Sequence, residues 1–214
     1  MGGCCCSCMG DDDDGALTTK ESELVKQDTA QKSINIRMSS PGIKVEGEGD
    51  LCATGSGLAL IGTALEQDAA YWEFHISLPV GKQVDTILFG VSTKKGRKFY
   101  EEVKYDEQSG EEGIPSEANG TDWMRCVEGI QNDDVIGIAM QQSDLPMVQF
   151  FHNGEALYDI VVNRFRGIVY PSVCLPASSV EKDLKVTAIV AENKFQQMSP
   201  AAKFGPIIVA RSIV

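Results

Sequence analysis

The stretch Asp133–Gly154, DDVIGIAMQQSDLPMVQFFHNG, decides the fold of this 214-residue chain. Two apolar runs, Val135–Met140 and Met147–Phe151, flank a polar break that contains a proline, and the second run ends at His152-Asn153-Gly154. Asn-Gly after such a run favours a tight hairpin turn, because both central positions of the turn take positive φ. We therefore expect strand, loop, strand, turn and a further strand at Ala156–Ile160. Two strands alone are marginally stable in water, so a larger sheet must surround them.

The rest of the sequence supplies short segments of strand character between glycine-rich turns. The clearest is Tyr71–Leu78, in which Trp72, Phe74, Ile76 and Leu78 alternate with Glu73, His75 and Ser77. This alternation predicts a half-buried strand, with His75 an ordinary polar residue on its less buried face. Further strands are predicted at Ile43–Glu46, Asp50–Ala53, Leu58–Gly62, Thr86–Thr93, Gly167–Leu175 and Leu184–Ala191, and the apolar end Gly205–Val214 could close a sheet edge.

Between Lys94 and Asn132 the pattern is least regular. Two aromatic-bearing pieces, Phe99–Tyr105 and Trp123–Val127, flank an acidic, glycine-rich loop at Asp106–Gly120. In total, about a dozen short strands with frequent turn signals and no firm helix predict an all-β protein, an antiparallel β-sandwich.

Composition excludes several classes of function. The net charge is −12, the pI is near 4.6 and 21 residues are glycine. No clustered Lys and Arg offer a nucleic-acid site, and no apolar run approaches the ~18 residues of a membrane span. The N-terminus lacks the charged and apolar regions of a secretory signal, so we expect a cytoplasmic chain that is not secreted.

The first eight residues, Met1-Gly2-Gly3-Cys4-Cys5-Cys6-Ser7-Cys8, predict lipidation. Removal of Met1 would expose Gly2 for N-myristoylation, although the stricter motif has Ser or Thr where this chain has Cys6. A single myristoyl chain binds membranes marginally and no basic patch follows, so palmitoylation of the cysteines is the expected second signal. The predicted lipidation sites are Gly2, Cys4, Cys5, Cys6 and Cys8. The alternatives are an unmodified tail, disulfides and a metal site. Disulfides are disfavoured in the cytosol, and a metal site is disfavoured because adjacent cysteines cannot easily all reach one ion.

The chain divides into two parts. Residues 1–33 are polar and acidic, with Asp11–Asp14 near their start, and we expect a disordered, flexible tether. Residues 34–214 are expected to form the β-sandwich domain.

Four motifs in the predicted domain resemble those of the SPRY family. They are Tyr71-Trp72-Glu73-Phe74, Asp134-Val135-Ile136-Gly137-Ile138, Phe150-Phe151-His152-Asn153-Gly154-Glu155 and Gly167-Ile168-Val169-Tyr170-Pro171-Ser172-Val173. Each is weak alone, but their order and spacing over a hundred residues resemble a SPRY (B30.2-like) domain. Asp133 departs from the family, which usually has glycine there. The resemblance implies a bent, concanavalin-like jelly-roll sandwich whose loops at one end bind a protein or peptide, and it assigns no ligand. Trp72, Phe74, Phe150 and Tyr170 are expected in the core.

No signature of catalysis is present. His75 and His152 are the only histidines, and neither a nucleophile elbow nor a phosphate loop occurs. The acidic runs Asp11–Asp14 and Asp106–Glu112 lack calcium-loop spacing. Cys52, Cys126 and Cys174 lie in apolar segments and are expected to be small buried hydrophobes. We expect no enzyme activity, cofactor, metal or small-molecule substrate.

The sequence thus favours a protein-interaction module tethered to the cytosolic face of a membrane, such as that of a cilium or vesicle. Its predicted contact surface is the loop end that carries Arg97, Tyr100, Tyr105, Trp123 and Arg125, since exposed aromatics beside arginines form binding hot spots. One alternative is a structural subunit of a larger cytosolic or ciliary assembly without a stable membrane anchor. Another is a lectin-like sandwich that binds glycan or calcium, which fold analogy alone supports.

Overall fold

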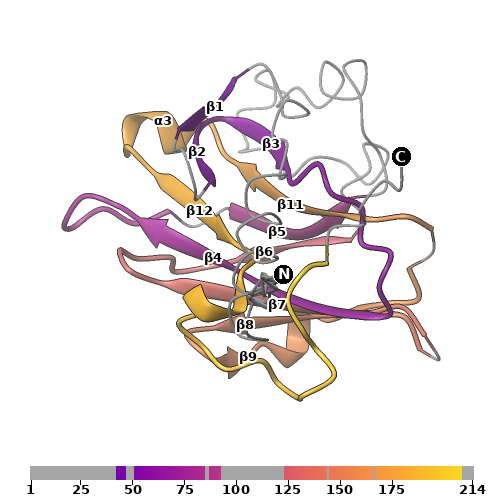
Figure 1. The fold of residues 1–214 in the computed structure, drawn as a ribbon. Coiled ribbons are helices and arrows are strands. Elements are labelled where there is room, and N and C mark those ends of the chain that lie inside the picture. Colours follow the sequence, from indigo (N-terminus) through magenta and orange to yellow (C-terminus); the bar gives the residue numbers. More distant parts are fainter. Residues whose placement is uncertain are drawn as a thin grey trace, which may run out of the picture.

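The computed structural model describes residues 42–46, 51–84, 87–92, 123–143, 145–165 and 167–208. These residues form mostly short strands and a few single helical turns (Figure 1). None of the helical turns has the length or apolar character of a membrane span. The strands are β1 (Ile43–Glu46), β2 (Leu51–Gly55), β3 (Gly57–Leu60), β4 (Ala69–Ser77), β5 (Ile87–Ser92), β6 (Met124–Val127), β7 (Val135–Gln141), β8 (Met147–His152), β9 (Glu155–Ala156), β10 (Val162–Asn163), β11 (Tyr170–Leu175) and β12 (Lys185–Ile189), and the helical turns are η2 (Tyr158–Ile160), α3 (Ser178–Glu181) and η3 (Glu192–Lys194).

The strands form two antiparallel sheets packed as a sandwich. The larger sheet has the order β1-β2-β12-β4-β7-β8-β10, with β9 paired to β8, and the smaller sheet has the order β3-β11-β5-β6. Gly55-Ser56-Gly57 carries the chain from β2 in the larger sheet to β3 in the smaller one, and both glycines have positive φ, 99° and 117°. The predicted antiparallel β-sandwich is therefore confirmed.

The stretch that decides the fold forms the predicted strands. Strands β7 and β8 pair from Ile136 opposite His152 to Gln141 opposite Met147. Asn153 and Gly154 have φ of 51° and 85°, as a tight hairpin turn requires. The third predicted strand, Ala156–Ile160, is wrong beyond its first residue: the chain leaves the sheet after Ala156 and forms the helical turn η2.

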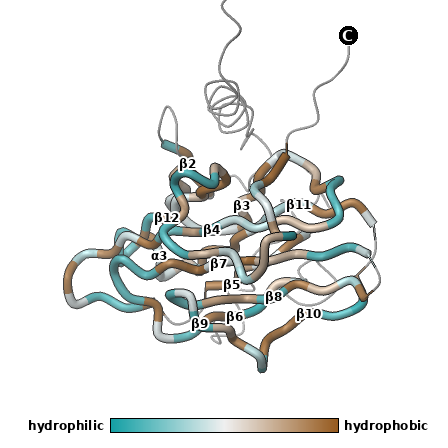
Figure 2. Tube along the Cα trace, turned by 60° about the horizontal axis from the view of Figure 1, so that its bottom comes forward, coloured by the Kyte–Doolittle hydropathy of each residue, from teal (hydrophilic) through white to brown (hydrophobic). Residues whose placement is uncertain are grey.

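The main core lies between the two sheets. Trp72, Phe74 and Phe150 are each at most 1% exposed within it, as predicted. Tyr170 is also buried, but it packs in a second apolar cluster on the outer face of the smaller sheet. The indole N–H of Trp72 has no hydrogen-bond partner in the described part of the chain. Figure 2 shows hydrophobic segments both along the strands and in short pieces of the peripheral loops.

The less buried face predicted for β4 is covered. Glu73 is fully buried, and His75 is partly buried beside it. A segment that we call the strap, Phe195–Phe204, crosses this face (Figure 1, yellow) and closes a third cluster of Tyr71, Ala139 and Phe204. The prediction of a half-buried strand is therefore wrong for the centre of β4, because the strap packs over its polar face.

Two smaller predictions need correction. Of the internal cysteines only Cys174 is buried, whereas Cys52 and Cys126 are partly exposed. The predicted edge strand Gly205–Val214 is reduced, among its described residues, to one parallel bridge between Gly205 and Ala70, with Ile207 buried. Residues 209–214 lie outside the described part.

Candidate functional site

One end of the sandwich is organised by the loop Ile61–Asp68, which joins β3 to β4. The side-chain amide of Gln142 donates to the carbonyls of Leu65 and Gln67 at 2.7 and 3.0 Å. The carboxylate of Asp68 accepts hydrogen bonds from the backbone N–H and hydroxyl of Ser143, both at 2.7 Å. These contacts fix the β7–β8 loop against the loop that enters β4.

The same loop also holds two further segments. The amide of Gln67 donates to the Pro206 carbonyl at 3.0 Å, and its oxygen accepts from the N–H of Ile208 at 2.7 Å. The N–H of Leu65 donates to the Val169 carbonyl at 2.9 Å. We call the region formed by residues 61–68, 142–143, 145–146, 167–169 and 205–208 the loop end.

Three large apolar side chains are exposed on the loop end. Leu145 is 74% exposed, Ile168 is 59% exposed and Ile208 is 67% exposed. Single exposed apolar residues are ordinary, but these three stand on loops that backbone and side-chain hydrogen bonds join to one another. This surface joins apolar groups to the exposed carboxylate of Asp68, and such a mixture suits contact with another protein.

The residues predicted to contact a partner are only partly described. Trp123 directly precedes β6 and is half buried, with its ring 5.7 Å from that of buried Phe165. Arg125 is half buried on β6 and donates to the Met124 carbonyl at 2.7 Å. Trp123 therefore packs against the core and keeps part of its side chain exposed. The other predicted residues, Arg97, Tyr100, Tyr105, Gly2, Cys4, Cys5, Cys6 and Cys8, lie outside the described residues.

The sequence analysis missed Leu145, Ile168 and Ile208. A signal for Leu145 existed, since it is a single large apolar residue in a polar, proline-containing loop. Ile168 and Ile208 lie in apolar runs that predicted strands. Their exposure depends on the strand boundaries, since β11 begins only at Tyr170 and no strand includes Ile208.

A second polar group lies under the strap. Glu73 Oε1 accepts from Tyr71 Oη at 3.2 Å and from the Gln197 N–H at 2.8 Å. Glu73 Oε2 accepts from the Gln196 N–H at 2.8 Å and lies 2.7 Å from His75 Nε2. Burial, with the charge of the neighbouring Glu73 carboxylate, raises the pKa of Tyr71 well above its ordinary value, so its hydroxyl keeps the proton that it donates.

The hydrogen bonds around Glu73 attach the strap to β4, and they do not have the arrangement of a catalytic dyad. His75 Nδ1 lies 3.2 Å from the side-chain nitrogen of Gln196, so with Nε2–H directed at Glu73 both ring nitrogens are engaged. In the described part of the chain, no serine or cysteine side chain hydrogen-bonds to either histidine, and no group of three or more His, Cys, Asp or Glu side chains could hold a metal ion.

A third polar group fixes the opposite end of the hairpin. Asp134 accepts from the Gln131 N–H at 2.7 Å and from the Asn153 amide at 2.8 Å. His152 Nε2 lies 2.8 Å from Asp134 Oδ2 but lacks hydrogen-bond geometry, so we treat this contact as electrostatic. Burial alone would raise the pKa of Asp134, but the hydrogen bonds from Asn153 and Gln131 and the adjacent His152 outweigh it and lower that pKa.

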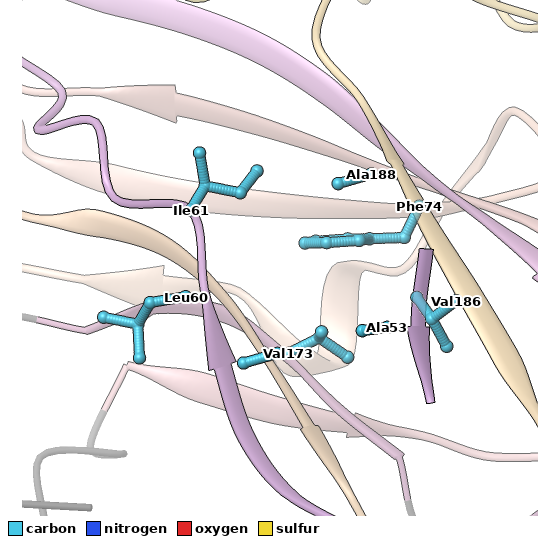
Figure 3. Close-up of a pocket in the computed structure, with 8 residues that line it drawn as sticks. Ala53, Leu60, Ile61, Phe74, Val173, Val186 and Ala188 are labelled. Carbon is cyan, nitrogen blue, oxygen red and sulfur yellow. The ribbon is translucent and has the colours of Figure 1, made fainter. Parts of the chain in front are cut away.

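A cavity between the sheets is too small to hold a ligand. It has a volume of about 10 Å³, near the limit for a single water molecule. Its walls are apolar, which disfavours water, and Figure 3 shows that side chains from both sheets surround it. They include Ala53, Ile61, Phe74, Val173, Val186 and Ala188.

Comparisons with known proteins give structural similarity only. No family model matches the chain, and no curated protein matches it. The SPRY domain of human HERC1 has a TM-score of 0.47 at 15% identity, with 76% of this chain and 99% of that one covered. The neuralized-NHR1 domain of Drosophila melanogaster has a TM-score of 0.47 at 8% identity, with 70% and 92% covered. Lectin II from Ulex europaeus has a TM-score of 0.44 at 10% identity, with 75% and 93% covered.

Proposed function

We propose that this chain is a non-catalytic protein-binding module whose contact surface is the loop end. The observation that carries the proposal is the exposure of Leu145, Ile168 and Ile208 on loops that hydrogen bonds hold in place. Those of Gln67, Gln142 and Asp68 hold the loops of Ile208 and Leu145, and the bond from the Leu65 N–H to the Val169 carbonyl holds the segment of Ile168. Preorganised loops lose little conformational freedom on binding, so apolar contact there is converted into affinity.

Two further features support this proposal. The four sequence motifs resemble the SPRY family, and the segment Leu51–Ala59 with the cysteine-rich N-terminus resembles SPRY domain-containing protein 7. Loops that meet at one end of a sandwich also present an area suited to a protein or peptide.

The test compares two variants of the full chain in which exposed apolar residues are replaced by charged ones. Leu145→Asp combined with Ile168→Asp should remove most proximity-labelled partners in cells. Val80→Asp is the control, because Val80 is 97% exposed in the turn that follows β4, outside the loop end. Both proteins should keep the wild-type unfolding midpoint. A folded double variant that labels the same partners as wild type would contradict the proposal.

We also propose that residues 1–33 tether the module to the cytosolic face of a membrane through myristate on Gly2 and palmitate on Cys4, Cys5, Cys6 and Cys8. One acyl chain gives only reversible binding, so both signals are needed. Full-length protein should partition with membranes in cells, and Gly2→Ala or the four-cysteine-to-serine variant should be soluble. A soluble wild-type chain would instead favour the alternative, a subunit of a cytosolic or ciliary assembly without stable anchoring.

A further inference from the structure

Strand β1 (Ile43–Glu46) ends the larger sheet on one side. It pairs with β2 along one edge, and the described part of the chain places no strand along the other, which we call the outer edge (Figure 1). Lys44, Val45 and Glu46 are exposed, and Val45 is 39% exposed although it is apolar. An exposed terminal strand is a template on which a further strand can pair.

The hydrogen bonds between β1 and β2 show which backbone groups face the outer edge. The Ser56 N–H donates to the Gly42 carbonyl at 3.3 Å, in the register that the two strands share. Hydrogen bonds in an antiparallel ladder alternate from one residue to the next, so the even-numbered residues Lys44 and Glu46 bond to β2. The N–H and carbonyl groups of Val45 therefore point to the outer edge.

The side chains of β1 divide between the two faces of the sheet. Ile43 packs against the main core, and Val45 lies opposite buried Ala53, so both belong to the inner face. Lys44 and Glu46 alternate with them and lie together on the solvent face. A strand that pairs with the outer edge therefore meets an apolar side chain on one face and two opposite charges on the other.

A second copy of β1 matches both faces in one register. In an antiparallel pair of identical strands, outward-bonding residues must face each other, so the two-fold axis passes through a residue rather than between two residues. An axis at Lys44 or at Glu46 places like charges opposite each other, and one at Ile43 places Lys44 opposite Gly42. An axis at Val45 pairs Lys44 of each copy with Glu46 of the other and brings the two Val45 side chains together on the inner face.

We infer that two copies of this chain associate through β1, as an antiparallel pair whose two-fold axis passes through Val45. The contact uses the same surface of both copies, so it contains the ion pair of Lys44 with Glu46 twice. Charged side chains usually protect an edge strand from pairing, but these charges complement those of a second copy. A strand of four residues buries less area than a standard interface, so the dimer forms at high protein concentration. The inference concerns β1 and does not rest on the proposed function of the loop end.

The test uses the reciprocity of the two ion pairs. Lys44→Glu and Glu46→Lys each turn both pairs into like-charge contacts, so each should weaken dimerisation of the full chain by roughly tenfold or more. The two substitutions shift the net charge in opposite directions, so a general charge effect would weaken one dimer and strengthen the other. An equimolar mixture of the two variants should form a heterodimer of wild-type strength, because opposite charges then meet in both pairs. Sedimentation velocity from about 1 μM to about 1 mM protein measures each association.

Hydrogen exchange in wild-type protein gives a second measurement that needs no variant. Exchange of the Val45 amide should slow as the protein concentration rises, because its N–H bonds to the second copy. Exchange of the Lys44 amide, which bonds to β2, should change little. A wild-type chain that stays monomeric over this range, single variants that dimerise as wild type does, a mixture that does not associate, or a Val45 amide that does not respond to concentration would each overturn the inference.

Discussion

Both faces of strand β4 are buried at its centre, but they are held by different forces. The inner face presents Trp72, Phe74 and Ile76 to the other sheet and is stabilised by apolar burial. The outer face presents Tyr71, Glu73 and His75 to the strap, where one buried carboxylate accepts hydrogen bonds from two backbone N–H groups and a tyrosine. The inner face can thus tolerate a different apolar residue of similar shape, whereas the outer face depends on one chemical group at one place.

The largest effect is expected at the inner face. Phe74→Ala should destabilise the whole domain by about 3–5 kcal/mol, because it removes a fully buried aromatic ring and leaves a cavity. Urea unfolding measures the loss, and hydrogen exchange should rise in both sheets. Exchange that rises only in the strap would contradict the assignment of Phe74 to the shared core.

A smaller and more local effect is expected at the outer face. Glu73→Ala leaves Tyr71 and two backbone N–H groups without their acceptor, at a cost of about 3 kcal/mol. Proteolysis should then cut within Phe195–Phe204 before the sandwich unfolds. Ser77→Ala is the control, because Ser77 is exposed on the same face of the same strand, and it should change nothing measurable.

Gly137 of β7 lies opposite Glu73 of β4, and the Tyr71 side chain packs against it on the outer face. A Cβ at Gly137 would lie 2.4 Å from the hydroxyl oxygen of Tyr71, which packs across it. Gly137→Ala should therefore displace the Tyr71 ring from Glu73 and destabilise the protein by about 1–3 kcal/mol. Tyr71→Phe in the same chain should recover part of the loss in urea unfolding, because it removes the atom that clashes. If Tyr71→Phe recovers none of the stability lost in Gly137→Ala, the clash with the Tyr71 hydroxyl is not the cause of the destabilisation.

The smallest effect concerns pH and Asp134, which ends the turn before β7. Its pKa is lowered in the folded protein, so its contribution to stability is present above the ordinary value of about 3.8 and is lost as the pH falls through the lower folded value. Below pH 4, unfolding midpoints of Asp134→Asn should fall less steeply with acid than those of wild type. Parallel curves would show that other carboxylates cause the acid sensitivity.

Local sequence predicted those parts of the fold that depend on neighbouring residues. The hairpin at Asn153-Gly154, the strands β7 and β8 and the apolar face of β4 follow from turn chemistry and period-2 alternation. The strap was missed because Phe195–Phe204 has no periodic pattern, and its docking depends on Glu73, more than a hundred residues away. The loop end was missed for a related reason: its loops are joined by glutamine side chains, and a lone Gln in a sequence carries no signal of the carbonyl that it will reach.

The sequence by itself determined the class of the fold, because alternation and positive-φ turns act over a few residues. It also determined the acidic charge and the cysteine-rich N-terminus on which the proposed anchor rests. Only the tertiary structure decided that a polar face of β4 is an interior and that Leu145, Ile168 and Ile208 share one exposed end. A residue is buried only where another segment packs over it, and the segments that cover these faces come from distant parts of the chain.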